Sequence, residues 1–128
     1  MAVIIELDTF MEGPTDLSAL KGIVPGEIKR IFYIYEANGQ TRGGHRHHLT
    51  WNVLVCIKGK CRVYSHDGET EQCFNLDNTG CGLVLEPRDW HVMDCFSQDA
   101  ILLVLSNQYY DKLDYIDQPY LLADNPEL

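Results

Sequence analysis

Short runs rich in β-branched and aromatic residues recur along this chain, separated by turn-forming residues at intervals of about ten positions. Such runs are typical of β-strands, and Asp67-Gly68 is a strong signal for a hairpin turn. The predicted strands cover residues 2–8, 27–36, 51–57, 61–66, 71–76, 82–86, 90–96 and 100–106. This spacing predicts an all-β sandwich or barrel. With 128 residues and no internal repeat or linker, we expect a single domain over residues 1–128.

Two predicted strands have apolar side chains on both faces. In the strand over residues 27–36, one face carries Ile31, Tyr33 and Tyr35, and the opposite face is also apolar. Residues 100–106 form an apolar run without polar alternation. Both strands are therefore predicted to be covered on both sides. A small open barrel with such a strand is expected to bury one face against a second copy, which predicts a homodimer.

The segments outside these strands follow other patterns. Residues 12–26 contain prolines and glycines, which predicts irregular structure with one short strand near residues 17–20. Tyr109, Leu113 and Ile116 recur at helical spacing, so a short C-terminal helix is predicted within residues 107–116. The acidic, proline-containing residues 117–128 are expected to be loosely held.

Charge and composition exclude several classes of partner. A net charge of −9 does not attract nucleic acid or an anionic membrane. No apolar run approaches the roughly 20 residues needed to span a bilayer, and the first six residues lack a basic region, so we expect a cytoplasmic protein. The five cysteines form no Cys-x-x-Cys pair, which argues against a disulfide framework. An anionic substrate would need local arginines, and the candidates are Arg42, Arg46, Arg62 and Arg88.

Three of the five histidines fall within positions 45–48. If this stretch is a strand, His45 and His47 point the same way, because residues two apart share a face. Two imidazoles on one face can bind a metal or move protons near neutral pH. The alternative is a polar turn whose histidines have no such role. His48 is expected to point away, and His66 is expected in a surface turn.

The order of these residues resembles the cupins, which are small antiparallel jelly-roll barrels. The first cupin motif is matched by Gly44, His45, His47, Asn52 and Gly59, and the second by Gly82, Pro87 and His91. This resemblance implies a single-domain cupin barrel.

Within the cupins, the segment Arg42-Gly43-Gly44-His45-Arg46-His47 resembles the Arg-Gly-x-His-x-His signature of the WxcM-like family, the dTDP-4-oxo-6-deoxyglucose 3,4-ketoisomerases. The resemblance extends over about residues 27–116. It departs from the family at residues 10–17, which lack the arginine of an N-terminal Asp-x-Arg-Gly-x-Leu segment. Asn52 stands where a glutamine is usual, and His91 where an arginine-like residue is frequent. These departures leave the exact substrate open.

The resemblance implies an isomerase that moves a keto group between C4 and C3 of a nucleotide-linked 4-keto-6-deoxyhexose through an enediol. Such a reaction needs a base with a pKa near neutral, a second proton carrier and donors that stabilise the enediolate, but no cofactor or metal. We expect His47 to act as base at C3 and His45 to deliver a proton to C4, although the two roles can be reversed. The candidate substrate-binding residues are Arg42 for the pyrophosphate, together with Tyr33, Tyr35, Arg46, Asn52, Trp90 and His91.

Two alternatives remain open at the level of the sequence. A metal-dependent cupin enzyme would use His45, His47 and His91 as ligands, with Asn52 as a weak fourth. A non-catalytic cupin that binds nucleotide sugars is compatible with the missing N-terminal arginine.

Overall fold

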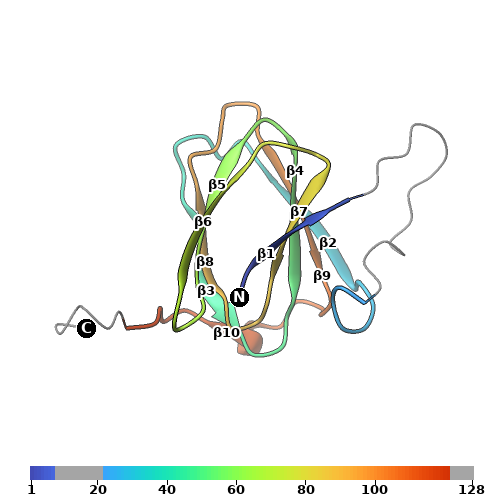
Figure 1. Ribbon diagram of the computed structural model, residues 1–128, viewed down its shortest axis with the longest axis vertical. Coiled ribbons are helices and arrows are strands. Elements are labelled where there is room, and N and C mark those ends of the chain that lie inside the picture. The colour runs from blue at the N-terminus through green and yellow to red at the C-terminus, as the bar shows by residue number, and fades with distance from the viewer. Residues whose placement is uncertain (8–21, 122–128) are drawn as a thin grey trace.

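The computed structural model describes residues 1–7 and 22–121, and these form two antiparallel sheets that face each other across a common core (Figure 1). The strands are β1 (Val3–Glu6), β2 (Arg30–Tyr35), β3 (Arg42–His47), β4 (Asn52–Lys58), β5 (Cys61–His66), β6 (Glu71–Leu76), β7 (Cys81–Leu85), β8 (Trp90–Asp94), β9 (Ile101–Ser106) and β10 (Tyr115–Ile116). The first sheet has the order β1-β7-β4-β9-β2, and the second has the order β10-β3-β8-β5-β6. The predicted all-β cupin barrel is confirmed.

Each predicted strand that lies in the described residues is present, with ends that differ by a few positions. The predicted strand near residues 17–20 and the motif position over residues 10–17 lie outside the described residues. The single domain over residues 1–128 therefore stays a prediction. None of the helical turns in the described part of the chain is long and apolar enough to cross a membrane.

The core lies between the two sheets, because alternate residues of each strand point inward. Leu54, Leu83 and Leu102 come from neighbouring strands of the first sheet and are at most 1% exposed. Full burial of such a side chain typically contributes about 1.5–3 kcal/mol. A second apolar cluster, which includes Val53 and Leu105, lies on the outer face of the same sheet. The first sheet is thus apolar on both faces, as the pattern of residues 100–106 predicted.

The outer face of β2 is not covered in the single chain. Phe32 and Ile34 pack against the core, as the alternation requires. On the other face, Ile31, Tyr33 and Tyr35 are 54%, 60% and 55% exposed. The prediction that both faces of this strand are covered is therefore wrong for the isolated chain, because β2 is the last strand of its sheet and nothing described packs over its outer side.

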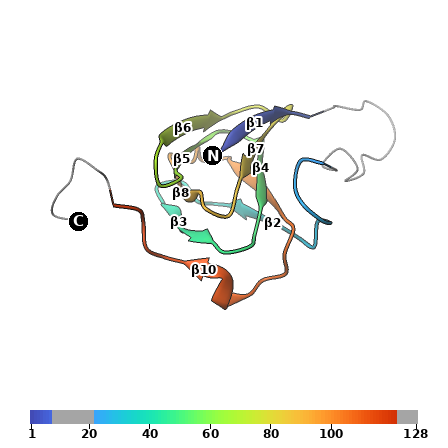
Figure 2. The ribbon, with the colours of Figure 1, turned by 60° about the horizontal axis from the view of Figure 1, so that its bottom comes forward.

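The predicted C-terminal helix is also wrong. Only the 3-10 turn η2 (Lys112–Asp114) forms, capped by the side chain of Asp111, which accepts from the backbone N–H of Leu113 at 3.0 Å. Leu113 is 85% exposed, so the apolar residues at helical spacing have no surface to pack against. Directly after η2, β10 pairs with the edge of β3, which satisfies the backbone through sheet hydrogen bonds instead (Figure 2).

A glycine bulge in β3 shapes the wall that carries the histidines. The register between β3 and β8 shifts between Gly43 and His45, and Gly43 has φ +84°. A Cβ atom on Gly43 would lie 2.8 Å from the carbonyl oxygen of His91. Only glycine accepts this conformation and this close approach without strain. Beyond the bulge, His45 lies opposite His91.

Candidate active site

A cavity of about 620 Å³ lies inside the barrel and is lined by residues of β2, β3, β4, β8, β9 and β10. This volume falls within the range of about 300–1,000 Å³ that is typical of small-molecule sites. Its wall includes Arg30, Arg42, His45, His47, Asn52, His91 and Tyr115. The predicted histidine pair therefore faces a space that can hold a sugar.

Three imidazoles lie together on this wall. The ring centroids of His45 and His47 are 5.1 Å apart, and those of His45 and His91 are 4.9 Å apart. His45 and His47 share a face because they are two residues apart on β3, as predicted. His91 joins them from β8, the neighbouring strand. The stretch is thus a strand and not a polar turn.

A buried carboxylate orients His47. Nδ1 of His47 donates to Oδ2 of Asp114 at 3.0 Å. Asp114 also accepts from the hydroxyl of Thr50 and from the backbone N–H of Leu49, the latter at 2.7 Å. Since an ionised carboxylate only accepts, Nδ1 of His47 carries the proton and Nε2 keeps its lone pair. Nε2 is buried and has no hydrogen-bond partner among the described residues. This arrangement leaves a free base on the cavity wall.

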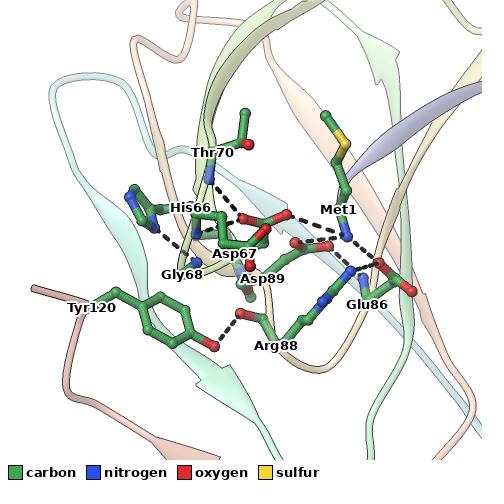
Figure 3. Close-up of polar contacts among 11 residues, drawn as sticks. Met1, His66, Asp67, Gly68, Thr70, Glu86, Arg88, Asp89 and Tyr120 are labelled. Atoms are coloured by element: carbon green, nitrogen blue, oxygen red, sulfur yellow. Dashed lines mark hydrogen bonds and ion pairs between the residues drawn. The ribbon is translucent and has the colours of Figure 1, made fainter. Parts of the chain in front are cut away.

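His91 is oriented by the turn that precedes β8. Its Nδ1 donates to the carbonyl oxygen of Asp89 at 3.0 Å. The Asp89 side chain closes this turn by accepting from the backbone N–H of Glu86 at 2.7 Å. The carboxylates of Asp89 and Glu86 both contact the amino group of Met1 (Figure 3). The hydroxyl of Tyr120 donates to the carbonyl oxygen of Arg88 at 2.8 Å, so the C-terminal segment also holds the turn.

The three histidines are neutral at physiological pH. Burial, followed by the neighbouring His45, lowers the pKa of His47 to about 4, although Asp114 opposes this. Burial lowers the pKa of His91 to about 3. Burial also lowers the pKa of His45, against the opposing effect of Asp117 and with a further contribution from Arg30. Hydrogen bonds from Thr50 and Leu49 keep the pKa of Asp114 below its ordinary value, although burial alone would raise it.

Three of the predicted substrate-binding residues lie on the cavity wall, and the side chain of each makes one hydrogen bond among the described residues. Arg42 is exposed, and its Nε donates to Oε1 of Gln40 at 3.0 Å. Asn52 is buried, and its Oδ1 accepts from the hydroxyl of Ser106. His91 is the third. Tyr33 and Tyr35 contribute to the wall, but their side chains belong to the exposed outer face of β2.

Two predicted substrate-binding residues serve the C-terminal segment instead of the cavity. The guanidinium of Arg46 lies 4.1 Å from the ring centroid of Tyr120, and its Nε donates to the carbonyl oxygen of Gln118 at 3.2 Å. Nε1 of Trp90 donates to the carbonyl oxygen of Asp117 at 3.4 Å. Neither side chain lines the cavity, because both lie on the face of their sheet that points away from it. Their assignment to substrate binding stays a prediction, which the position of both side chains outside the cavity does not support.

Three further sequence expectations concern residues away from the cavity. Arg62 forms a bidentate pair with Asp94, in which Nε donates to Oδ1 at 2.8 Å and Nη2 donates to Oδ2 at 2.7 Å. Arg88 is exposed beside Glu86. His66 is buried and not a surface residue, since its ring packs 5.7 Å from that of Tyr120 and its Nδ1 accepts from Gly68 (Figure 3).

Sequence reasoning missed three side chains of the site. Arg30 occupies the same face of β2 as Phe32, so strand alternation alone could have placed its charge on the inner side. Asp114 and Tyr115 were expected in a helix, where their relation to β3 could not be inferred. Only the pairing of β10 with β3 brings them to His47.

The three histidines could also hold a metal ion. One ring nitrogen of each lies within 4.8 Å of the others. Neutral imidazoles are good ligands for zinc, copper, iron or nickel. The same neutral imidazoles can instead exchange protons with a bound sugar.

This fold and this site define a small cupin whose cavity is lined by three clustered histidines. Comparison with protein families then gives the particular group: residues 2–123 match the family described as "FdtA: WxcM-like, C-terminal". The chain belongs to this family. The predicted enzyme class, a sugar-nucleotide 3,4-ketoisomerase, is confirmed.

Individual relatives agree with this membership. A TDP-4-oxo-6-deoxy-alpha-D-glucose-3,4-oxoisomerase of Aneurinibacillus thermoaerophilus is 44% identical over 96 residues, which are 74% of this chain and 69% of the relative. The structure of WlaRA, a TDP-fucose-3,4-ketoisomerase from Campylobacter jejuni, matches with a TM-score of 0.82 and 34% identity, covering 91% of this chain and 89% of the other. A mutant of the 3,4-ketoisomerase QdtA from Thermoanaerobacterium thermosaccharolyticum, in complex with TDP-4-keto-6-deoxyglucose, matches with a TM-score of 0.78 and 28% identity over 91% and 87% of the two chains.

Proposed function

We propose that this protein moves the keto group of a TDP-linked 4-keto-6-deoxyhexose between C4 and C3. The observation that carries the proposal is the pair of neutral imidazoles, His45 and His47, 5.1 Å apart on the wall of a cavity of about 620 Å³. The relatives named above act on or bind TDP-linked sugars of this kind.

The reaction begins at C3 of the sugar. Nε2 of His47 takes the proton from C3, and the electron pair moves to the carbonyl oxygen on C4 to give an enediolate. Asp114 favours this role for His47, because its carboxylate fixes the tautomer and stabilises the imidazolium that forms. His47 is therefore the base at C3 in this proposal.

The second half of the reaction adds a proton to C4. The oxygen on C4 gains a proton, the oxygen on C3 loses one, and C4 receives a proton by way of His45. One C–H bond and one O–H bond are broken, and one of each forms, so no hydride leaves the sugar. The two rings are in edge contact, which suits a proton relay between adjacent carbons. The isomerisation thus needs no external oxidant or nicotinamide.

Exchange in deuterated water tests this function. The protein is incubated with TDP-4-keto-6-deoxyglucose in deuterated water, and the sugar is analysed by NMR for deuterium at C3 and C4 and for the 3-keto product. We expect both labels and the new ketone. Tight binding without exchange would identify a non-catalytic nucleotide-sugar binder and overturn the proposal.

The clustering of His45, His47 and His91 favours a metal-dependent cupin enzyme as the second candidate function. Metal analysis of protein purified without added metal separates the two functions. A near-stoichiometric transition metal that is lost together with activity on chelation would select the metal enzyme. Full exchange activity in protein stripped by a chelator would select the histidine mechanism.

Arg42 is proposed to bind the pyrophosphate, because it is an exposed cation on the cavity wall whose guanidinium donates, among the described residues, only to Gln40. We expect Arg42→Ala to raise KM about tenfold, the equivalent of roughly one charge-assisted hydrogen bond, with kcat within about threefold of the parent enzyme. Steady-state kinetics with the TDP sugar measures both constants. Arg62→Ala is the control, since Arg62 pairs with Asp94 on the outside of the barrel and should leave KM unchanged. An unchanged KM in Arg42→Ala would remove this residue from the binding site.

A homodimer is proposed through the outer face of β2. Ile31, Tyr33 and Tyr35 form an exposed apolar row that continues into the outer face of β9, and such rows commonly mark protein interfaces. We expect the protein to sediment as a dimer and Ile31→Glu to shift it toward the monomer, because burial of an unpaired carboxylate opposes association. Asn75→Glu is the charge-matched control, because it makes the same change of charge at an exposed position of β6 in the other sheet. Sedimentation of the parent protein as a monomer at micromolar concentration would refute the dimer.

A further inference from the structure

Arg30 and Tyr115 join the two sheets across the cavity. Arg30 is the first residue of β2, the edge strand of the first sheet, and Tyr115 is the first residue of β10, the edge strand of the second. Nη1 of Arg30 donates to the hydroxyl of Tyr115 at 3.3 Å, and both residues line the cavity. Residues 85 positions apart in the sequence thus form one polar contact beside the histidines.

Tyr115 touches both imidazoles that are proposed to move protons. Its backbone pairs with that of His47. Its ring centroid is 4.7 Å from that of His45 and 4.6 Å from that of His47. A sugar placed against these two rings therefore also meets the tyrosine.

The contact with Arg30 determines what the tyrosine hydroxyl can do. A guanidinium has five N–H donors and no acceptor, so the hydroxyl oxygen of Tyr115 accepts and its own hydrogen is free to donate. Arg30 is held in place by aromatic rings, with its guanidinium 4.3 Å from the ring centroid of Phe32 and 5.2 Å from that of Tyr110. The pair therefore presents to the cavity an O–H donor whose oxygen accepts a hydrogen bond from a cation.

The isomerisation needs such a donor. Removal of the proton from C3 places negative charge on the oxygen attached to C4, and in the second half of the reaction on the oxygen attached to C3. A preorganised donor aimed at the developing charge is often the largest single contribution to catalysis. Tyr33 and Tyr35 are the tyrosines that the sequence proposes for substrate binding, but their side chains are more than half exposed on the outer face of β2.

We propose that Tyr115 is a catalytic residue that donates a hydrogen bond to the enediolate oxygen, and that Arg30 positions and polarises its hydroxyl. This inference rests on the proposed function. The charge of Arg30 also contributes to the low pKa of His45 and of His47, which agrees with a cation placed where negative charge develops.

Tyr115→Phe removes only the hydroxyl and keeps the ring that packs on the histidines. We expect kcat to fall about 10²–10³-fold, as for the loss of one oxyanion donor, with the rate of deuterium exchange at C3 falling in parallel. KM and the affinity for TDP, measured by calorimetry, should stay within about threefold. Tyr109→Phe is the matched control, because Tyr109 is 72% exposed in the same C-terminal segment and lies outside the cavity wall. A kcat for Tyr115→Phe within threefold of the parent would overturn the proposal.

The role of Arg30 is tested with Arg30→Gln and with the double variant. If Arg30 acts through Tyr115, Arg30→Gln lowers kcat. Adding Tyr115→Phe to the Arg30→Gln variant then lowers kcat by a much smaller factor than Tyr115→Phe does in the parent protein. Loss of TDP affinity by more than tenfold with unchanged kcat would make Arg30 a phosphate ligand and overturn this part of the proposal. An inactive parent enzyme would refute the proposed function itself, whereas an active parent with an unimpaired Tyr115→Phe variant refutes only the role of the tyrosine.

Discussion

Replacing His47 with asparagine should lower kcat by about 10²–10⁴-fold, which is the usual contribution of a well-placed general base. The asparagine amide can still donate to Asp114, so the buried carboxylate keeps a partner and the fold is expected to persist. What disappears is the lone pair of Nε2, which has no hydrogen-bond partner in the described part of the chain and faces the space for the sugar. Deuterium exchange at C3 should be lost in proportion to kcat.

His48→Asn is the matched control for this variant. His48 is the next residue along the chain and is exposed, so the activity of the His48→Asn variant should stay within about twofold of the parent. TDP binding by His47→Asn, measured by calorimetry, should be preserved if the residue serves chemistry and not affinity. Retention of more than a tenth of the exchange rate in His47→Asn would transfer the role of base to His45.

The pH dependence provides a second measurement of the same assignment. The base must be unprotonated, and the pKa of His47 is lowered to about 4, so kcat/KM should stay level from neutral pH down to about pH 5 and fall only below that. The ionisable groups around His47 are His45, His91, Asp114, Tyr115 and Arg30. An acidic limb near the ordinary histidine value of about 6.5 would mean that the base is not buried during the reaction.

Asp114→Asn is the second large effect that we expect, with a loss of about 10²–10³-fold in kcat. The carboxylate holds the proton of His47 on Nδ1 and stabilises the imidazolium after C3 is deprotonated. An asparagine can present its N–H₂ group to Nδ1, which would favour the opposite tautomer and place the proton on Nε2, where the lone pair is needed. Since Asp114 does not line the cavity, KM and TDP affinity should change by less than about threefold.

Asp111→Asn is the control for this change. Asp111 caps the same 3-10 turn, and asparagine is an equally good cap, so the turn and the activity should both be retained. Activity assays and thermal unfolding of both variants separate a positioning effect from a structural one. Equal kcat values in Asp114→Asn and the parent enzyme would show that His47 does not depend on this carboxylate.

Local patterns along the chain were enough to predict the strands and the shared face of the histidine pair. The i, i+2 spacing of His45 and His47 places both rings on one side of β3, because alternation in a strand does not depend on the rest of the molecule. The same alternation correctly separated the two faces of β2. It could not say which face would be covered, since coverage depends on what packs beside an edge strand.

The residues that the structure places differently from the sequence expectation share a cause. Arg46 and Trp90 stand next to the site in the sequence, but they point to the opposite side of their strands and hold the C-terminal segment. Tyr109, Leu113 and Ile116 have helical spacing, but a helix needs a partner surface for its apolar side, and the edge of β3 captured the segment instead. Spacing gives the direction of a side chain within an element and does not identify the neighbours of that element.

The sequence by itself therefore determined the β-barrel class, the family and the two histidines on a common face, because these follow from short-range periodicity and from motif order. Only the tertiary structure decided that Asp114 orients His47, that His91 completes the cluster, and that Arg30 meets Tyr115 across the cavity. Those contacts join residues 46 to 85 positions apart, or lie between neighbouring strands. They arise from the pairing of strands within the second sheet and from the approach of the two edge strands, β2 and β10, which no local pattern encodes.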